Sequence, residues 1–281
     1  MKVAVTSASG QLGTAVVNQL KTEIGEENCI GVARTPEKAK HLGVEIRKGD
    51  YSSKSDFLSA LKGTDAVLII SGNAAPEDRI GQHRNIIEAA KEVGVKKIVY
   101  TSIVGQKGDF AFSPIIESNR LTEEDVKASG LDWAIGRNGL YIEPDFEYVK
   151  HYEKDGFISN CAEAGLCAYT SRKELAVAYA RMLTEEKHNG QVYNLVGHPV
   201  SQLVLADVIN RKFGKSLYYK PMSVEDYEKE RTEALGPFLG KVIAGIYHGI
   251  QLGFFNPPSD FEKATGRQHI SPDEMAEVFK N

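Results

Sequence analysis

The sequence has few cysteines, no long apolar run and no excess of basic residues. Its three cysteines, Cys29, Cys161 and Cys167, cannot all pair with one another. Neither they nor the seven scattered histidines have the spacing of a metal site, so we expect no metal. A reduced, cytoplasmic setting is therefore expected, in which the cysteines are small buried hydrophobes. No stretch approaches the roughly 18 apolar residues that cross a bilayer, and the first apolar run is too short for a signal peptide.

The charged residues argue against a nucleic-acid partner. The chain carries 34 Lys and Arg against 38 Asp and Glu, which gives a net charge of −4 without a long basic run. A protein that binds a phosphate backbone needs a dense Lys and Arg surface, which this composition does not supply. With 281 residues, 42% of them hydrophobic, the chain is typical of a globular protein with one large or two modest domains.

The first half of the sequence alternates between two hydrophobic periods. Short apolar runs predict strands, and segments with apolar residues at helical spacing predict helices between them. This alternation predicts an α/β protein with a doubly wound parallel (Rossmann) sheet and right-handed crossovers. The expected strands are 2–6, 29–33, 44–47, 66–70, 97–101 and 132–136, and the expected helices are 11–21, 36–41, 54–61, 76–93 and 115–128.

The pattern changes after Gly136. The later segments predict helices at 173–183, 203–213 and 224–234, strands at 191–196 and 217–220, and a stretch rich in glycine and aromatic residues at 235–258. We expect a first domain over 1–136, which 173–197 rejoins. Segments 137–172 and 198–281 are expected to form a smaller, mixed α/β C-terminal lobe that closes over the ends of the sheet.

A glycine-containing turn joins the first expected strand to the first expected helix. It reads Thr6-Ser7-Ala8-Ser9-Gly10-Gln11-Leu12-Gly13. Phosphates bind where backbone N–H groups approach closely at a helix N-terminus, whose dipole favours negative charge. Gly10 would leave room for a pyrophosphate, and Gly13 would let the helix pack on the strand. A GxxGxxG turn has glycine where this chain has Ser7, which adopts a positive φ poorly. The turn predicts a dinucleotide site, with a plain tight turn as the alternative.

The end of the second expected strand indicates which dinucleotide would bind. NAD sites place Asp or Glu there for the ribose hydroxyls, whereas this chain has Arg34, 21 residues after Gly13, and Lys38 shortly beyond it. A guanidinium binds a 2′-phosphate in fork geometry, and the lysine adds a second positive charge. The pattern favours NADP(H), with an ordinary solvated arginine as the alternative.

Small polar residues follow the next three expected strands. The carboxyl ends of parallel strands in an open sheet form the rim of the ligand crevice. We expect adenine near Asp50 and Tyr51, and the ribose and nicotinamide along a path past the later strand ends. Taken singly, each of these residues is as typical of an ordinary turn. The contacts expected on this path are Ser71, Gly72, Asn73 and Thr101.

Several segments together resemble the NmrA-like branch of the atypical short-chain dehydrogenases/reductases. Within it, the chain is most similar to type 2 NAD(P)H:quinone oxidoreductases and triphenylmethane reductases, and the likeness thins after about residue 220. The resemblance implies an NADPH-binding Rossmann domain, a small C-terminal lobe and a cleft between them. It also implies that 137–143 lines the nicotinamide and substrate side and that Arg172 reaches the cofactor. The segments that carry it are 9–13, 32–39, 49–51, 82–85, 137–141, 170–176 and 192–195.

The Tyr-x-x-x-Lys pair of ordinary short-chain dehydrogenases has no counterpart at its usual place. The one match, Tyr169 with Lys173, precedes a late helix, and we interpret it as coincidence. Glu124 stands near the position where many extended relatives carry the lysine. A quinone accepts hydride directly and can take its proton from water, so positioning matters more than an acid. The missing pair argues against alcohol–ketone interconversion and is compatible with quinone or dye reduction.

These patterns predict an NADPH-dependent oxidoreductase that transfers hydride to a quinone or a similar planar, electron-poor acceptor, with Asn138 and Tyr141 positioning the acceptor. The alternatives are a non-catalytic NADP(H)-sensing regulator and, more weakly, a sugar-nucleotide epimerase, which would need the Tyr/Lys pair. Whether the chain forms a homodimer stays open. The expected cofactor contacts are Thr6, Ser7, Ala8, Ser9, Gly10, Gln11, Leu12, Arg34, Lys38, Asp50, Tyr51, Ser71, Gly72, Asn73, Thr101, Arg137, Asn138, Gly139, Leu140, Tyr141 and Arg172.

Overall fold

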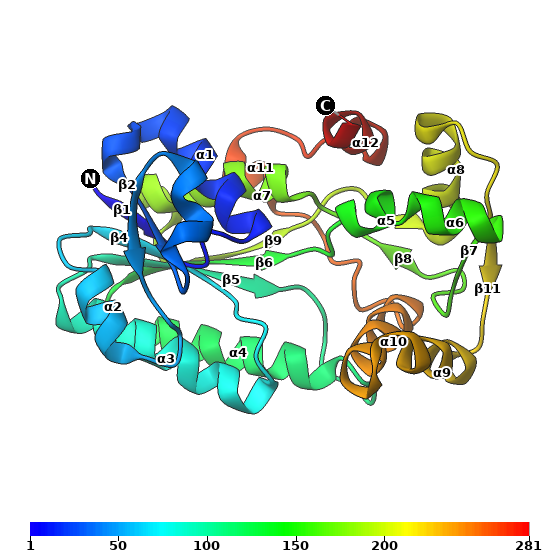
Figure 1. Ribbon diagram of the computed structural model, residues 1–281, viewed down its shortest axis with the longest axis horizontal. Coiled ribbons are helices and arrows are strands. Elements are labelled where there is room, and N and C mark those ends of the chain that lie inside the picture. Colours follow the sequence, from blue (N-terminus) through cyan, green and yellow to red (C-terminus); the bar gives the residue numbers. More distant parts are fainter. Residues whose placement is uncertain (281) are drawn as a thin grey trace.

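A seven-stranded parallel sheet forms the centre of the larger part of the protein (Figure 1). We describe residues 1–280 of a computed structural model. The strands lie in the order β3-β2-β1-β4-β5-β6-β9, so the winding direction reverses between β1 and β4. The predicted doubly wound sheet is therefore confirmed. The strands are β1 (Val3–Val5), β2 (Cys29–Ala33), β3 (Glu45–Lys48), β4 (Ala66–Ile70), β5 (Lys97–Ile103), β6 (Asp132–Asn138) and β9 (Gln191–Leu195).

Helices cover both faces of this sheet because the central strands are apolar on both sides. Strands β1, β2 and β4 are buried at every position, as expected for parallel strands between two helical layers. Helices α1 and α7 pack against each other on one face, and α2, α3 and α4 lie on the other (Figure 1). Their bounds are α1 (Gln11–Ile24), α2 (Lys54–Ala60), α3 (Pro76–Glu92), α4 (Ser113–Lys127) and α7 (Arg172–Thr184).

A smaller lobe lies beyond the carboxyl ends of the strands (Figure 1). It contains two small sheets, one of β8 (Leu166–Cys167) with β10 (Val200–Ser201) and one of β7 (Phe157–Asn160) with β11 (Tyr218–Pro221). This confirms the expected mixed lobe, while the exact division of the chain into domains stays a prediction. The helices of this part are α5 (Glu143–Glu147), α6 (Val149–Asp155), α8 (Gln202–Phe213), α9 (Val224–Leu235), α10 (Pro237–Gln251) and α12 (Pro272–Lys280), and α11 (Phe261–Thr265) lies beside α7.

Three local expectations differ from the structure. Segment 36–41 forms a 3₁₀ helix, Pro36–Leu42, rather than an α-helix. Helix α10 occupies most of 235–258, for which no helix is predicted. A Cβ on Gly245 would lie 2.5 Å from the backbone nitrogen of Phe112, so glycine there allows close packing rather than a loop. Strand β6 continues to Asn138 because its last two residues pair with the end of β5.

Two absences concern the part of the chain that the structure describes. None of its helices has both the length and the apolar character that a bilayer crossing requires. No group of His, Cys, Asp or Glu side chains within residues 1–280 is arranged to hold a metal ion.

Candidate cofactor and acceptor site

The turn after β1 has the shape of a phosphate-binding turn. Ser7 adopts a left-handed conformation with φ +50°, at the position where a GxxGxxG turn has glycine. Gly13 packs directly on this turn, since a Cβ on it would lie 2.3 Å from the carbonyl oxygen of Ser7. Gly10 precedes α1, whose first-turn N–H groups have no partner earlier in the helix. These N–H groups and the helix dipole are suited to a phosphate.

Tyr51 fastens this turn to the neighbouring strand. Its hydroxyl donates to the carbonyl oxygen of Ile70 over 2.7 Å and accepts from Ser7 Oγ over 3.0 Å. It also lies 2.5 Å from Thr6 Oγ1, which itself accepts from the backbone N–H of Ile70. Burial raises the pKa of Tyr51 to about 12, so this hydroxyl stays protonated at neutral pH. The tyrosine therefore ties the ends of β1 and β4 together, and its ring alone is left for the expected adenine.

A cavity of about 580 Å³, which we call the cofactor groove, runs from the end of β2 to the end of β4. Arg34 and Lys38 stand at one end of it, both exposed, and neither side chain has a hydrogen bond or an ion pair within the described residues. Two uncompensated cations in this place fit a 2′-phosphate. The other predicted contacts that line the groove are Ser7, Ser9, Gly10, Asp50, Tyr51, Gly72 and Asn73.

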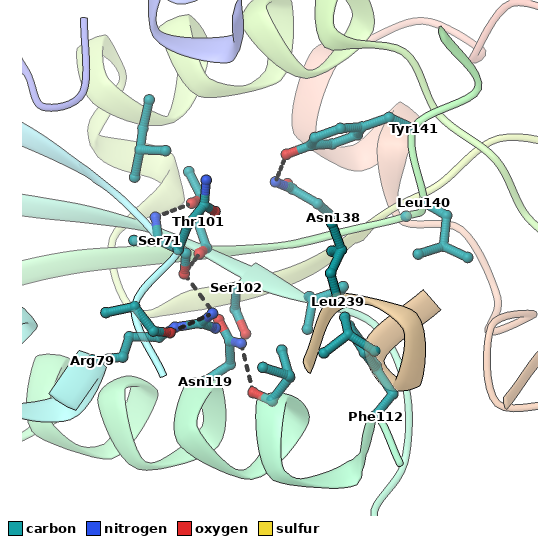
Figure 2. Close-up of a pocket in the computed structure, with 18 of the residues that line it drawn as sticks. Ser71, Arg79, Thr101, Ser102, Phe112, Asn119, Asn138, Leu140, Tyr141 and Leu239 are labelled. Atoms are coloured by element: carbon teal, nitrogen blue, oxygen red, sulfur yellow. Dashed lines mark hydrogen bonds between the residues drawn. The ribbon is translucent and has the colours of Figure 1, made fainter. Parts of the chain in front are cut away.

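A second cavity of about 470 Å³, which we call the cleft cavity, lies between the ends of β4, β5 and β6 and helix α10 (Figure 2). It shares Gly72, Asn73 and Ala74 with the cofactor groove, so the two spaces meet at the end of β4. On the side of the smaller lobe its wall is apolar and consists of Phe238, Leu239 and Val242. The predicted residues that line it are Ser71, Gly72, Asn73, Thr101, Asn138, Gly139, Leu140 and Tyr141.

Asn138 and Tyr141 meet inside the cleft cavity (Figure 2). The amide oxygen of Asn138 accepts from the hydroxyl of Tyr179 over 2.5 Å, and its Nδ2 donates to the hydroxyl of Tyr141 over 3.2 Å. Because the Tyr141 oxygen accepts this hydrogen bond, its own proton is free for another partner. Burial raises the pKa of Tyr141, so the hydroxyl remains a donor at neutral pH.

The polar floor of the cleft cavity is held by hydrogen bonds among its own members. The backbone N–H of Ser71 donates to Thr101 Oγ1 over 2.9 Å, and Ser71 Oγ donates to the carbonyl oxygen of Thr101 over 2.7 Å. Asn119 on α4 accepts from the Tyr100 hydroxyl over 2.8 Å and donates to the carbonyl oxygen of Ile115 over 2.8 Å. These side chains therefore fix the shape of the floor.

Comparison with known proteins identifies the family. A family profile described as NAD(P)H-binding matches residues 7–186, which is more than half of the chain. A curated relative, quinone oxidoreductase 2 of Escherichia coli, is 33% identical over 229 residues, covering 80% of this chain and 79% of the relative. This chain belongs to the NAD(P)H-binding, NmrA-like family. The resemblance inferred from the sequence is thereby confirmed.

Two solved structures extend the similarity of this NmrA-like protein to nearly its full length. The NADPH complex of the quinone oxidoreductase QOR2 from Escherichia coli has a TM-score of 0.90 at 29% identity, covering 99% of this chain and 100% of that chain. The NADP(H) complex of triphenylmethane reductase from Citrobacter sp. has a TM-score of 0.88 at 31% identity, covering 99% of each chain.

Six predicted contacts of the NmrA-like protein line neither cavity. Arg137 points to α4, where it donates to Glu123 over 2.9 and 2.7 Å. Successive side chains of a strand face opposite sides, so Arg137 and Asn138 cannot both face the cleft. The guanidinium of Arg172 lies 5.1 Å from the centre of the Tyr141 ring and contacts the cofactor groove nowhere. A direct cofactor contact by these two arginines stays a prediction. The other four are Thr6, Ala8 and Leu12, which are buried, and Gln11, which is exposed on α1.

The apparent Tyr-x-x-x-Lys match of this NmrA-like chain lies outside both cavities. Tyr169 is 2% exposed in the core of the smaller lobe, and its hydroxyl accepts from Gln202 Nε2 over 2.9 Å. Lys173 is exposed on α7. Glu124 is also exposed, whereas its neighbour Glu123 is buried. Burial raises the pKa of the Glu123 carboxyl, but the nearby arginines and Ser102 more than offset this and lower its pKa overall.

Sequence reasoning missed two buried polar residues on α3 of the NmrA-like protein. Arg79 lines the cleft cavity and is 7% exposed. His83 is fully buried, and its Nε2 accepts from the backbone N–H of Gly72 over 3.1 Å. Burial, together with the charge of Arg79, lowers the pKa of His83 to about 3, so the imidazole is neutral. Helical spacing could have predicted their burial, because both residues lie on the same face of the helix as the apolar Ile86 and Ala90.

Proposed function

We propose that this protein is an NADPH-dependent reductase that transfers hydride to a quinone or a similar planar, electron-poor acceptor. The continuity of the cofactor groove with the cleft cavity carries this proposal, since a cationic, phosphate-sized end leads directly to an apolar pocket. The cofactor, when bound, supplies the hydride, and the reaction converts NADPH, quinone and one proton to NADP⁺ and hydroquinone. The relatives named quinone oxidoreductase and triphenylmethane reductase support the same chemistry.

The chain's own residues would bind the cofactor along the groove. Arg34 and Lys38 would hold the 2′-phosphate, and the first-turn N–H groups of α1 beside Gly10 would hold the pyrophosphate. Asp50 lines the same groove and would accept from an adenine amine, since within the described residues its carboxylate accepts only from Ser52 N–H. The end of β4 would then direct the reactive half of the cofactor toward the cleft cavity.

The cleft cavity would bind and orient the acceptor. Leu140 and the apolar residues of α10 suit a flat ring and exclude water from it. Tyr141 has a free hydroxyl proton that can be donated to an acceptor oxygen, and Asn138 fixes the direction of that hydroxyl. Since no acid is needed to reduce a quinone, this positioning and a proton from solvent suffice.

The competing function is a regulator that binds NADP(H) without turnover. Steady-state oxidation of NADPH, followed by nicotinamide absorbance with and without 1,4-benzoquinone, separates the two. We expect oxidation that depends on the quinone and saturates with it. Tight NADPH binding without quinone-dependent oxidation, tested also with a naphthoquinone, would contradict the reductase and favour the regulator.

A further inference from the structure

Arg79 is a buried cation that faces the cleft cavity, and residues 1–280 give it no anionic partner (Figure 2). It lies in the first turns of α3 and is 7% exposed. Its only hydrogen bond within the described residues runs from a terminal nitrogen to the carbonyl oxygen of Ala74 at 3.4 Å, which is long. Its Nε is buried and has no hydrogen-bond partner in the described part of the chain. The fork of the guanidinium is therefore almost entirely unsatisfied.

Other arginines near this region have carboxylate partners. Arg120 and Arg137 share the buried Glu123, at 2.8 and 2.7 Å. Arg84, five residues further along α3, pairs with Asp125 at 2.8 Å. A buried charge without a partner destabilises a protein strongly, and burial accordingly lowers the pKa of Arg79. An anionic group that enters from the cleft cavity would remove this cost.

We propose that Arg79 binds an anionic oxygen of the acceptor, so that the preferred acceptors are planar, electron-poor rings that carry a carboxylate, a sulfonate or an ionised hydroxyl. This inference rests on the proposed function of the cleft cavity as the acceptor site. The apolar wall on α10 receives the ring, and Arg79 reaches the cavity from α3 (Figure 2). A planar guanidinium whose one hydrogen bond within the described residues is long matches the two oxygens of a carboxylate or sulfonate.

A pair of redox-inert probes of equal shape tests the inference without turnover. 2-Naphthalenesulfonate and 2-naphthalenesulfonamide differ mainly in charge, and calorimetry on the NADP⁺-loaded protein measures their Kd values. We expect the sulfonate to bind about tenfold to a hundredfold more tightly, as a charge-assisted hydrogen bond allows. Arg79→Met should abolish this preference. Arg84→Met, the same change on an exposed arginine of the same helix, should retain it. Equal Kd values in the parent protein, or a preference that survives Arg79→Met, would overturn the inference.

The alternative, that Arg79 binds the cofactor and not the acceptor, is tested by a separate measurement. NADPH affinity, measured by nicotinamide fluorescence, should be unchanged in Arg79→Met, and a loss of tenfold or more would overturn the acceptor assignment. Circular dichroism checks the fold. If Arg79→Met does not fold, Arg79→Lys, which keeps the charge but not the fork, should show a reduced preference for the sulfonate. An undiminished preference in the lysine variant would contradict fork recognition.

Turnover separates this inference from the proposed function. The kcat/KM ratio of 1,2-naphthoquinone-4-sulfonate to 1,2-naphthoquinone should fall in Arg79→Met and stay unchanged in Arg84→Met. A slower reaction of both quinones by the same factor would mean that Arg79 acts on charge that develops during reduction, and would overturn anion selection. If neither quinone is reduced but the sulfonate probe still binds through Arg79, the reductase proposal fails and the anion site stands.

Discussion

Asp145 provides a quantitative test of the energetics of the smaller lobe. This residue of α5 is 4% exposed, and it accepts a hydrogen bond from the Tyr152 hydroxyl over 2.8 Å. Burial raises the pKa of the carboxyl from 3.8 to about 6, although hydrogen bonds from Tyr152 and Tyr247 act in the opposite direction. The folded protein therefore binds this proton more tightly than the unfolded chain does.

The sign of the pH dependence follows from this shift. The stabilisation that protonation provides is complete below the unfolded value of 3.8 and is lost as the pH rises through about 6. A difference of roughly two pKa units corresponds to about 3 kcal/mol in the free energy of unfolding. About half of that is lost between pH 5 and pH 8.

We expect Asp145→Asn to remove this loss. The difference in the free energy of unfolding, variant minus parent, should increase by about 1–2 kcal/mol from pH 5 to pH 8. Urea unfolding followed by circular dichroism at several pH values measures it, with Asp155→Asn, an exposed residue of α6, as the matched control. A difference between variant and parent that does not change with pH would refute the reasoning.

Three further predictions concern the choice of cofactor, the phosphate-binding turn and the role of Tyr169. Arg34→Ala should weaken NADPH binding by about tenfold to a hundredfold while leaving NADH unchanged, and equal affinities of the parent for both cofactors would contradict NADPH selection. Ser7→Gly removes the strain of a positive φ, about 1 kcal/mol, and it also removes the hydrogen bond from the serine hydroxyl to Tyr51. The affinity for NADPH, measured by titration, should not fall, and a tenfold weaker affinity would show that the hydroxyl is needed for binding. Tyr169→Phe should lower stability by about 1–3 kcal/mol, because it leaves the amide of Gln202 unsatisfied, yet keep quinone reduction within a few-fold; a loss of 10²–10⁴-fold would mark a general acid.

The sheet was predictable because its signal is local. Strand β4 matches its predicted bounds, 66–70, since five consecutive apolar residues between polar ends fit only a fully buried strand of this length. Helix α10 was missed because its glycines, which let it approach Phe112 and its neighbours, resemble loop residues when the partner is unknown. Tertiary contact, rather than propensity, makes that segment helical.

The site was predictable in part for a similar reason. Residues that follow parallel strands meet at one edge, so Gly72 and Thr101 could be expected near the same ligand. The partners of buried polar groups depend on elements far apart in the sequence. Arg137 forms an ion pair with Glu123 on α4 instead of facing the cleft, and no spacing in the sequence predicts this pair. The burial of Arg79 likewise depends on contacts between elements, since the ends of β4, β5 and β6 and helix α4 line the same cavity.

The hydrogen bond from Gly72 N–H to His83 bears on how kinetic pH profiles of this protein are interpreted. Histidine is the side chain usually held responsible for a rate change between pH 6 and 7. With a pKa of about 3, His83 does not change its protonation state in that interval. Its Nε2 therefore continues to accept the hydrogen bond from Gly72 N–H, at the end of β4 where the two cavities meet. The backbone at that junction should thus be insensitive to acidity throughout the neutral range. A titration seen there in turnover must originate in another group, such as an ionisable acceptor.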